Sequence, residues 1–352
     1  METRKLQAVG GGTTFAVSLP KPWIENLGLS AGDEIMLDPR SDGTIVLSVA
    51  RDHRMKGPDR EVRVDAADAS GVLRTIIGLY VSGLETTTLI YKSPSTAATR
   101  AGVADACERL HGLQVVEEGP DRVMLQDLAD PTEFNMDKGL RRMQLLVIQL
   151  LSDAMRLAAG EGDAEAILRE CQRHESEVDR LLILLMKQHN VLLQRSQFSA
   201  STAVPASESL WYMFVAQFLE RIADYVMRIS ASCAFIARHP DLEVTTRLRL
   251  GLAQARTLVE DSVRAFNTKD AQLANSVISQ VLVFAPGSGT NEMFDHFTSP
   301  RSEPQVFSCQ RCIKFFSVIE SIERLGLYAK SIAEMAINRS LGTRPDDATP
   351  VV

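Results

Sequence analysis

From about residue 134 to residue 341 the sequence repeats apolar side chains at helical spacing, and this pattern limits the possible folds more than any other feature. In the first segment they recur three or four positions apart, at Leu140, Met143, Val147, Leu150, Ala154 and Leu157. Such spacing places them on one side of an α-helix. Five more helical segments follow, and a polar break divides the six into two sets of three. The pattern predicts an all-α bundle of two three-helix repeats over residues 132–341.

Two short strings support an internal duplication. Residues 219–225 read Leu-Glu-Arg-Ile-Ala-Asp-Tyr, and residues 322–328 read Ile-Glu-Arg-Leu-Gly-Leu-Tyr. Each string lies midway along the third helix of its set. The two sets are therefore expected to share one ancestral three-helix unit.

The sequence before the bundle predicts two smaller domains, so the expected fold class is multidomain. Residues 1–50 read as short strands and turns, which predicts a β-rich module. A polar, rather basic linker over residues 51–63 leads to residues 61–130, where the order β-α-β-α-β-β predicts a small α/β domain with its helices on one face of a sheet. About 50 residues bury little core alone, so the N-terminal module is expected to dimerise or dock.

Composition limits the cellular setting. The apolar fraction of 45% and charged fraction of 24% suit a folded chain, and the net charge of −7 offers no overall attraction to nucleic acid. No apolar run reaches membrane-spanning length and residues 1–14 lack a signal-peptide core, so a cytoplasmic location without membrane insertion is expected. The five cysteines, including the Cys309/Cys312 pair, are expected to be reduced thiols of helix cores.

Two acidic pairs carry the strongest chemical signal. Glu175 and Asp179 lie four residues apart on one predicted helix, and Glu220 and Asp224 lie four apart on the next. This spacing puts both acids of a pair on one helix face, one turn apart. Four carboxylates gathered between helices repel one another, and a hard cation such as Mg²⁺, Mn²⁺, Fe or Zn²⁺ would remove that repulsion. The alternative is two solvated helix faces that bind nothing.

Two three-helix repeats with a Glu-x-x-x-Asp motif, together with the string at residues 219–225, resemble the PhoU family. The resemblance covers residues 132–341. It implies a non-enzymatic regulator of phosphate uptake or phosphate signalling, which docks on a phosphate ABC transporter or a signalling protein. It also implies a divalent or trivalent metal ligated by Glu175, Asp179, Glu220 and Asp224.

The second repeat departs from the family pattern. Leu327 stands where an Asp is expected after Glu323, and Asn275 and Ser279 stand where the preceding helix should carry acids. One metal site, or none, is therefore expected.

The N-terminal module has a second resemblance. Thr13 to Trp23, followed by Leu27 to Ile35 with its Gly32-Asp33 turn, is similar to the AbrB/SpoVT swapped-hairpin family. This likeness implies an intertwined homodimer, and many members bind DNA. Joined to PhoU-like repeats, it resembles an archaeal-type arrangement of phosphate regulators.

The candidate DNA-binding residues are Arg4, Lys5, Lys21 and Arg40. Residues 1–50 contain these four basic residues and six acidic ones. DNA binding depends on neutralising phosphate charge with basic side chains, so this balance is unfavourable. Dimerisation without DNA binding is thus a second possibility. Two functional alternatives remain open: a carboxylate-bridged metalloenzyme on a helical bundle, and a metal-binding scaffold with no role on DNA.

Overall fold

The computed structural model describes most of the chain, in these ranges: residues 3–26, 28–39, 43–49, 60–65, 68–92, 94–129, 135–194, 204, 206–237, 242–284 and 309–341. Most of the predicted linker and of the predicted loops at residues 196–206 and 285–304 lie outside these ranges, as does Arg40. The chain divides into two compact units, residues 1–56 and 57–352.

The N-terminal unit consists of two hairpins and a short helix. Strands β1 (Gln7–Val9) and β2 (Thr14–Ala16) pair antiparallel around the turn η1 (Gly10–Gly12). Helix α1 (Lys21–Asn26) follows, and then β3 (Ile35–Pro39) pairs antiparallel with β4 (Ile45–Val49). The predicted strand, short helix, turn and hairpin are all present.

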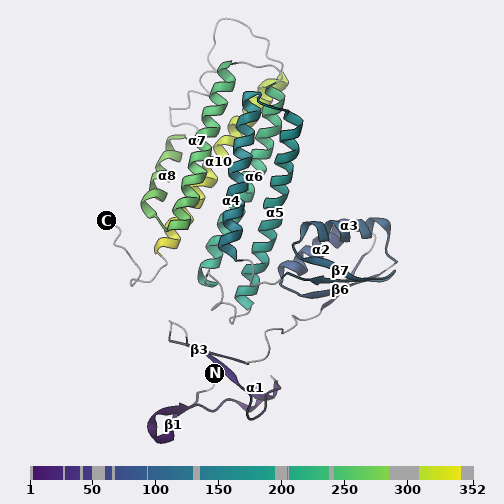
Figure 1. Cartoon of the computed structure of the whole chain (residues 1–352), viewed down its shortest axis with the longest axis vertical. Coiled ribbons are helices and arrows are strands. Elements are labelled where there is room, and N and C mark those ends of the chain that lie inside the picture. Colours follow the sequence, from purple (N-terminus) through teal and green to yellow (C-terminus); the bar gives the residue numbers. More distant parts are fainter. Residues whose placement is uncertain are drawn as a thin grey trace. The chain divides into compact units, whose positions relative to one another are not determined.

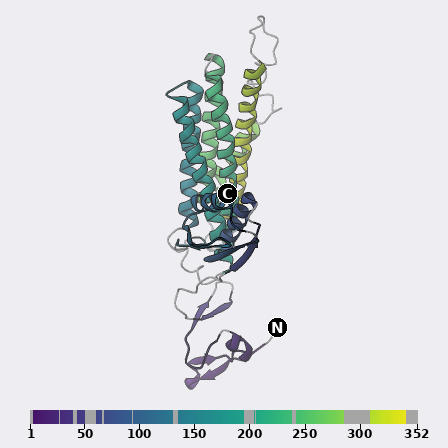
Figure 2. The same cartoon turned by 90° about the vertical axis from the view of Figure 1, so that its right-hand side faces the viewer.

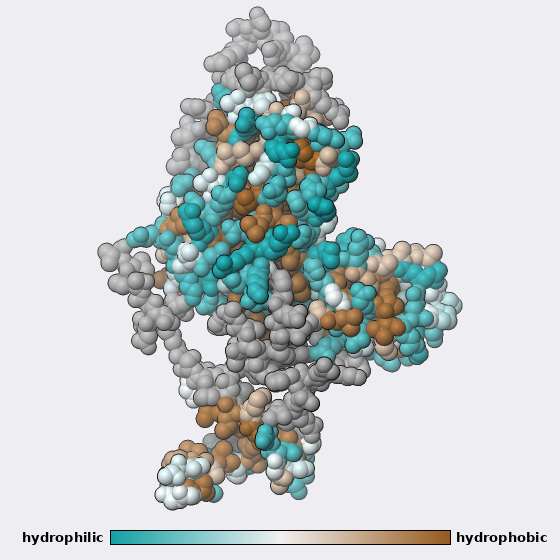
Figure 3. Space-filling view, in the orientation of Figure 1, coloured by the Kyte–Doolittle hydropathy of each residue, from teal (hydrophilic) through white to brown (hydrophobic). Residues whose placement is uncertain are grey.

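Apolar side chains of this unit are largely exposed. Leu29 is the one buried hydrophobic residue among the residues of the unit whose burial the structure describes. Figure 3 shows hydrophobic surface on this unit. The exposed apolar residues come from both hairpins and their flanks: Leu6, Val9, Phe15, Val17, Met36, Leu37 and Ile45. A segment of this size with so little buried apolar surface needs a partner surface to be stable.

The second unit begins with the predicted α/β domain. Its sheet has the order β5-β6-β8-β7, in which β5 and β6 are parallel and the remaining pairs are antiparallel. The strands are β5 (Arg60–Val64), β6 (Thr86–Tyr91), β7 (Leu113–Glu118) and β8 (Arg122–Asp127). Helices α2 (Ala69–Val81) and α3 (Ala97–Arg109) cover one face of this sheet, as predicted (Figure 1).

The remainder of this unit is the helical bundle. Its helices are α4 (Met136–Ala159), α5 (Ala164–Gln194), α6 (Ala206–Ile236), α7 (Leu242–Thr268), α8 (Ala271–Phe284) and α10 (Cys309–Leu341). Within each set the third helix packs on the other two, and α6 packs along α10 to join the sets (Figures 1 and 2). The predicted two-repeat bundle is confirmed. In the part of the chain that the structure describes, no helix is long and apolar enough to cross a membrane.

Local sequence explains where the first helices end and begin. Gly160 has a left-handed backbone (φ 70°) and ends α4, with the amide of Glu161 donating to the Arg156 carbonyl at 3.0 Å. Asp163 then caps α5 by accepting from the Glu165 amide at 3.0 Å. The predicted seam of α4 is buried in one core that both repeats share.

The matching strings of the two repeats meet at the join. Tyr225 and Tyr328 close the two strings, and their ring centroids lie 5.9 Å apart. Tyr328 also lies 6.1 Å from Phe218. Corresponding residues of the two repeats thus touch along the α6–α10 contact, as expected when two copies of one unit pack face to face.

The α/β domain is fixed to the bundle through α5. Lys187 of α5 is buried and forms an ion pair with Asp127, which is equally buried at the end of β8. One turn further on, the Asn190 side chain donates to the Val81 carbonyl at the end of α2, at 2.8 Å. Leu184 belongs to the core of the α/β domain and not to that of the bundle. We call these contacts the docking interface.

A buried ion pair that loses one partner leaves the other charge stranded in a low dielectric. Asp127→Asn should therefore lower the free energy of unfolding by about 3–5 kcal/mol, as measured by urea denaturation. The control is Glu117→Gln, which removes an exposed ion pair with Arg122 in the same domain and should leave the midpoint nearly unchanged. Equal effects of the two substitutions would contradict a buried pair at the docking interface.

Candidate metal centre

Helices α5 and α6 pack side by side, and each carries one of the predicted acidic pairs. Glu175 and Asp179 lie one turn apart on α5, and Glu220 and Asp224 lie one turn apart on α6. All four residues are half-buried. Only 16% of the Glu220 side chain and 36% of the Asp224 side chain are exposed. We call these four residues the acidic cluster.

The acids of the two helices affect one another electrostatically. Partial burial raises the pKa of Glu175, and the charges of Asp179 and Asp224 raise it further. Burial likewise raises the pKa of Asp179 and the pKa of Glu220, and Asp224 adds to both shifts. The ionised form of these carboxyls is therefore disfavoured. The negative charges that disfavour it belong to acids of both α5 and α6. The two pairs lie within electrostatic reach of one another, which their separation in sequence did not guarantee.

Two arginines offset part of this charge. Arg221 lies within the α6 motif, and its guanidinium is 3.4 Å from Glu220 and 3.5 Å from Asp224. The charges of Arg109 and Arg221 also act to lower the pKa of Asp179, against the larger effect of burial. Neither Arg109 nor Arg221 is among the site residues predicted from the sequence. Arg221 could have been found from its place between the two acids, whereas Arg109 comes from another domain.

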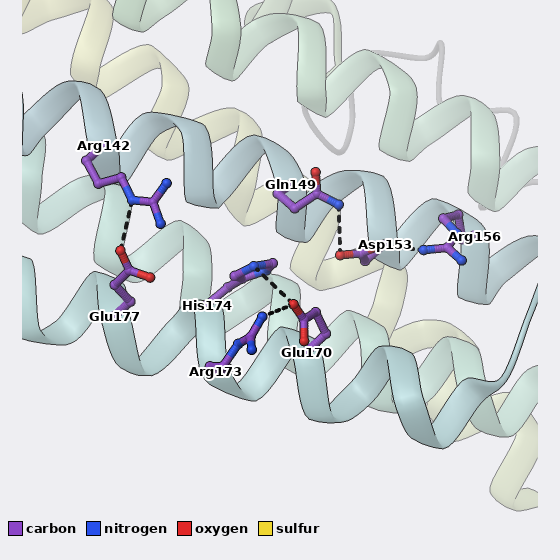
Figure 4. A network of polar contacts seen from close by, with 8 residues as sticks. All are labelled: Arg142, Gln149, Asp153, Arg156, Glu170, Arg173, His174 and Glu177. Carbon is purple, nitrogen blue, oxygen red and sulfur yellow. Dashed lines mark hydrogen bonds and ion pairs between the residues drawn. The ribbon is translucent and has the colours of Figure 1, made fainter.

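Other acids of α5 already have basic partners, which Figure 4 shows. Glu177 accepts from Arg142 of α4 at 2.8 Å, and Glu170 is paired with Arg173. His174, next to Glu175 in sequence, lies 3.8 Å from Glu170. On α4, Asp153 accepts from Gln149 and Arg156.

The donor chemistry of the acidic cluster suits a hard cation, because it consists of carboxylate oxygens alone. The four carboxylates lie further apart than the ligands of a bound metal ion. Among the described residues, no three His, Cys, Asp or Glu side chains are close enough together to hold an ion. Cation binding would thus require the carboxylates to turn toward one another and Arg221 to give way.

The second repeat lacks three of the four acids, at positions 275, 279 and 327. Leu327 is exposed at the position that matches Asp224. Asn275 and Ser279 of α8 are exposed too, and both bond to carbonyls of their own helix, at 2.9 and 3.0 Å. Glu323 is left as the acid of the motif.

The candidate DNA-binding residues are only partly described. Arg4, Lys5 and Lys21 are exposed, and Lys21 lies 3.5 Å from Glu25 within α1. Arg40 lies outside the described residues. Basic side chains are thus present on the surface of the N-terminal unit, some of them beside acids.

Raised carboxyl pKa values predict a specific pH dependence without metal. The folded protein binds more protons at Glu175, Asp179 and Glu220 than the unfolded chain does, so stability falls as pH rises through the folded pKa values. Asp179→Asn/Glu220→Gln should therefore raise Tm at pH 7, by at most about 2–4 °C, and flatten its pH dependence between pH 5 and 7. Thermal unfolding in EDTA measures both. The control Glu170→Gln/Glu177→Gln removes paired acids and should not raise Tm.

Comparisons with known proteins give matches to the helical bundle and to the N-terminal unit. Residues 140–232 match the family model of the PhoU domain, and this match contains the whole acidic cluster. Residues 11–54 match the model described as antidote-toxin recognition MazE, bacterial antitoxin. Among solved structures, the chain is similar to PhoU from Pseudomonas aeruginosa, with 20% identity over 59% of this chain and 96% of that chain and a TM-score of 0.49. No curated protein sequence matches it.

Each matched segment overlaps one of the two predicted resemblances, but the PhoU match covers residues 140–232 of the predicted 132–341. The MazE match contains the strand, short helix and turn on which the AbrB/SpoVT likeness rests, and the PhoU match runs from α4 almost to the end of α6. The chain therefore contains a PhoU domain in the first repeat of its helical bundle and an AbrB/MazE-like segment at its N-terminus.

Proposed function

We propose that this protein is a non-enzymatic regulator of phosphate uptake or phosphate signalling that binds a metal ion at the acidic cluster. The observation that carries the proposal is the mutual electrostatic effect of Glu175, Asp179 and Glu220 with Asp224, inside the segment that matches the PhoU domain. A divalent or trivalent cation would relieve this repulsion, and Mg²⁺, Mn²⁺, Fe and Zn²⁺ all accept carboxylate oxygens.

The N-terminal unit is proposed to form a homodimer that binds DNA. Its exposed apolar residues, such as Phe15 and Leu37, support a dimer because a second copy offers the complementary apolar surface. Within a dimer, Arg4 and Lys5 are present twice, which increases the local positive charge. Antitoxin-type modules of the matched family give a reason to expect a nucleic-acid or protein partner.

The bundle is proposed to contact the rest of the phosphate system. By resemblance, its partner would be a phosphate ABC transporter or a signalling protein, and DNA binding would place the chain in the cytoplasm. The protein would then link the state of phosphate transport to gene expression, with the bound cation as part of the surface that a partner contacts.

Metal binding is tested by titrating the metal-free full chain with Mn²⁺ and measuring free Mn²⁺ by electron paramagnetic resonance. Glu220→Ala/Asp224→Ala removes two proposed ligands and should weaken affinity at least ~10-fold. Glu170→Ala/Glu177→Ala removes two acids that are already ion-paired on α5, and should change affinity far less. No binding by the wild type, or equal losses in the two variants, would show that the acidic cluster is not the site.

DNA binding is tested by mobility shift of promoter DNA at several salt concentrations, with sedimentation to confirm the dimer. Arg4→Ala/Lys5→Ala removes four positive charges from a dimer, so the slope of log K against log salt should become shallower by up to about 3.6. Lys138→Ala/Arg141→Ala on α4 removes as much charge from the bundle and should leave the slope unchanged. If the wild type produces no shift even at low salt, the DNA role is wrong and a metal-binding scaffold remains.

A further inference from the structure

The four-stranded sheet of the α/β domain has one face that α2 and α3 do not cover (Figure 1). Side chains of a strand point alternately to the two faces of a sheet. Leu89, Val123 and Leu125 point toward the helices and are buried in the core of the domain. Ile90 and Met124 point the other way, are half-buried and, among the described residues, belong to neither hydrophobic core. We call this second side of the sheet the open face.

Strand pairing places the charged side chains of the open face in two neighbouring rows. In one row Glu61 lies beside Thr88, Thr88 lies beside Met124, and Met124 lies beside Glu117. We call this the acidic row, after its two end residues. The neighbouring row, two residues away on each strand and thus about 7 Å distant, is the basic row. It consists of Arg63, Ile90 and Arg122.

An ion pair shows that both rows lie on the same face. The side chains of Glu117 and Arg122 are 2.7 Å apart, and they remain 51% and 55% exposed. Glu61 and Arg63, on the edge strand β5, are exposed as well, and neither forms an ion pair with another described residue. The open face therefore presents charges of both signs, in a fixed order, to a partner.

An acidic row beside a basic row is complementary to itself. A two-fold axis that crosses the strands between the rows places the acidic row of one copy on the basic row of another. Glu61 then faces the partner's Arg63, and Thr88 faces the partner's Ile90, across sheets that pack about 10 Å apart. An axis along the strands would place acids on acids, so the charge pattern selects the first arrangement.

We propose that the open face docks on the same face of a second copy of this chain, with acidic row on basic row. The inference rests on the homodimer proposed for the N-terminal unit, and adds a second contact between the same two copies.

The size of the open face explains why it needs that homodimer. Two rows over four strands cover about 300 Å², whereas a stable interface buries about 800 Å² per partner. The N-terminal unit therefore has to keep the two copies close together, which raises their effective concentration. Because the docking interface fixes the α/β domain to α5, the added contact also holds the two bundles of the dimer in one arrangement.

The first test is the dissociation constant of the dimer, measured on the full chain by sedimentation equilibrium at low ionic strength. Glu61→Arg places arginine on arginine at both symmetric contacts, and should weaken the dimer roughly 10-fold. Glu61→Arg/Arg63→Glu exchanges the two charges, which restores opposite pairs, and should return the constant to the wild-type value. Glu118→Arg makes the same change of charge beside Val123, on the other side of the sheet, and should have no effect.

The outcomes separate this inference from the proposed homodimer. If the wild type dimerises and Glu61→Arg weakens it no more than Glu118→Arg does, the open face is not an interface and the N-terminal dimer stands. Weakening that the exchanged variant does not reverse would overturn the pairing of the two rows. A monomeric wild type would overturn both the homodimer and the added contact.

A second measurement maps the contact directly. Arg63→Lys supplies an amine that a carbodiimide couples to a carboxylate in contact with it, forming an amide while the carbodiimide takes up the water. In dimers of one light and one heavy-isotope copy, mass spectrometry should find the Glu61 peptide of one copy joined to the new lysine of the other. Glu61→Gln/Arg63→Lys lacks the carboxylate and should give no such product. Products within single copies only, or none at all, would overturn the inference.

Discussion

The packing of α6 against α4, α5 and α10 is the constraint on which the arrangement of the bundle depends. Three neighbouring helices bury most of its circumference, including Leu219, Ile222 and Val226. Glu220 and Asp224 must therefore lie at the margin of the contact with α5, where water reaches them only in part. This partial burial strengthens the repulsion between the carboxylates, because full exposure would screen that repulsion and full burial would neutralise the acids.

Helix α5 serves two structures at once. Its first half carries Glu175 and Asp179 against α6, and its second half belongs to the surface of the α/β domain through Lys187 and Asn190. The α/β domain and the bundle belong to one compact unit, residues 57–352.

The two repeats have kept their packing while their surfaces diverged. Core positions of α10 such as Ile322 and Leu325 are buried like their counterparts in α6. The acidic positions differ instead: Leu327 is exposed where the first repeat has Asp224. A packed interior tolerates few changes of volume, whereas an exposed position tolerates most, so one repeat could lose its acids without losing the fold.

The sequence by itself determined the helices, their order in two sets of three and the two acidic pairs, because each is a local pattern with a fixed period. It also contained Arg221 within the motif, although spacing alone did not identify its role. Only the tertiary structure decided that the pairs on α5 and α6 affect one another and that Lys187 meets Asp127, 60 residues earlier in the chain. Contacts between residues distant in sequence depend on which helix faces meet, and no periodicity within one chain segment records that choice.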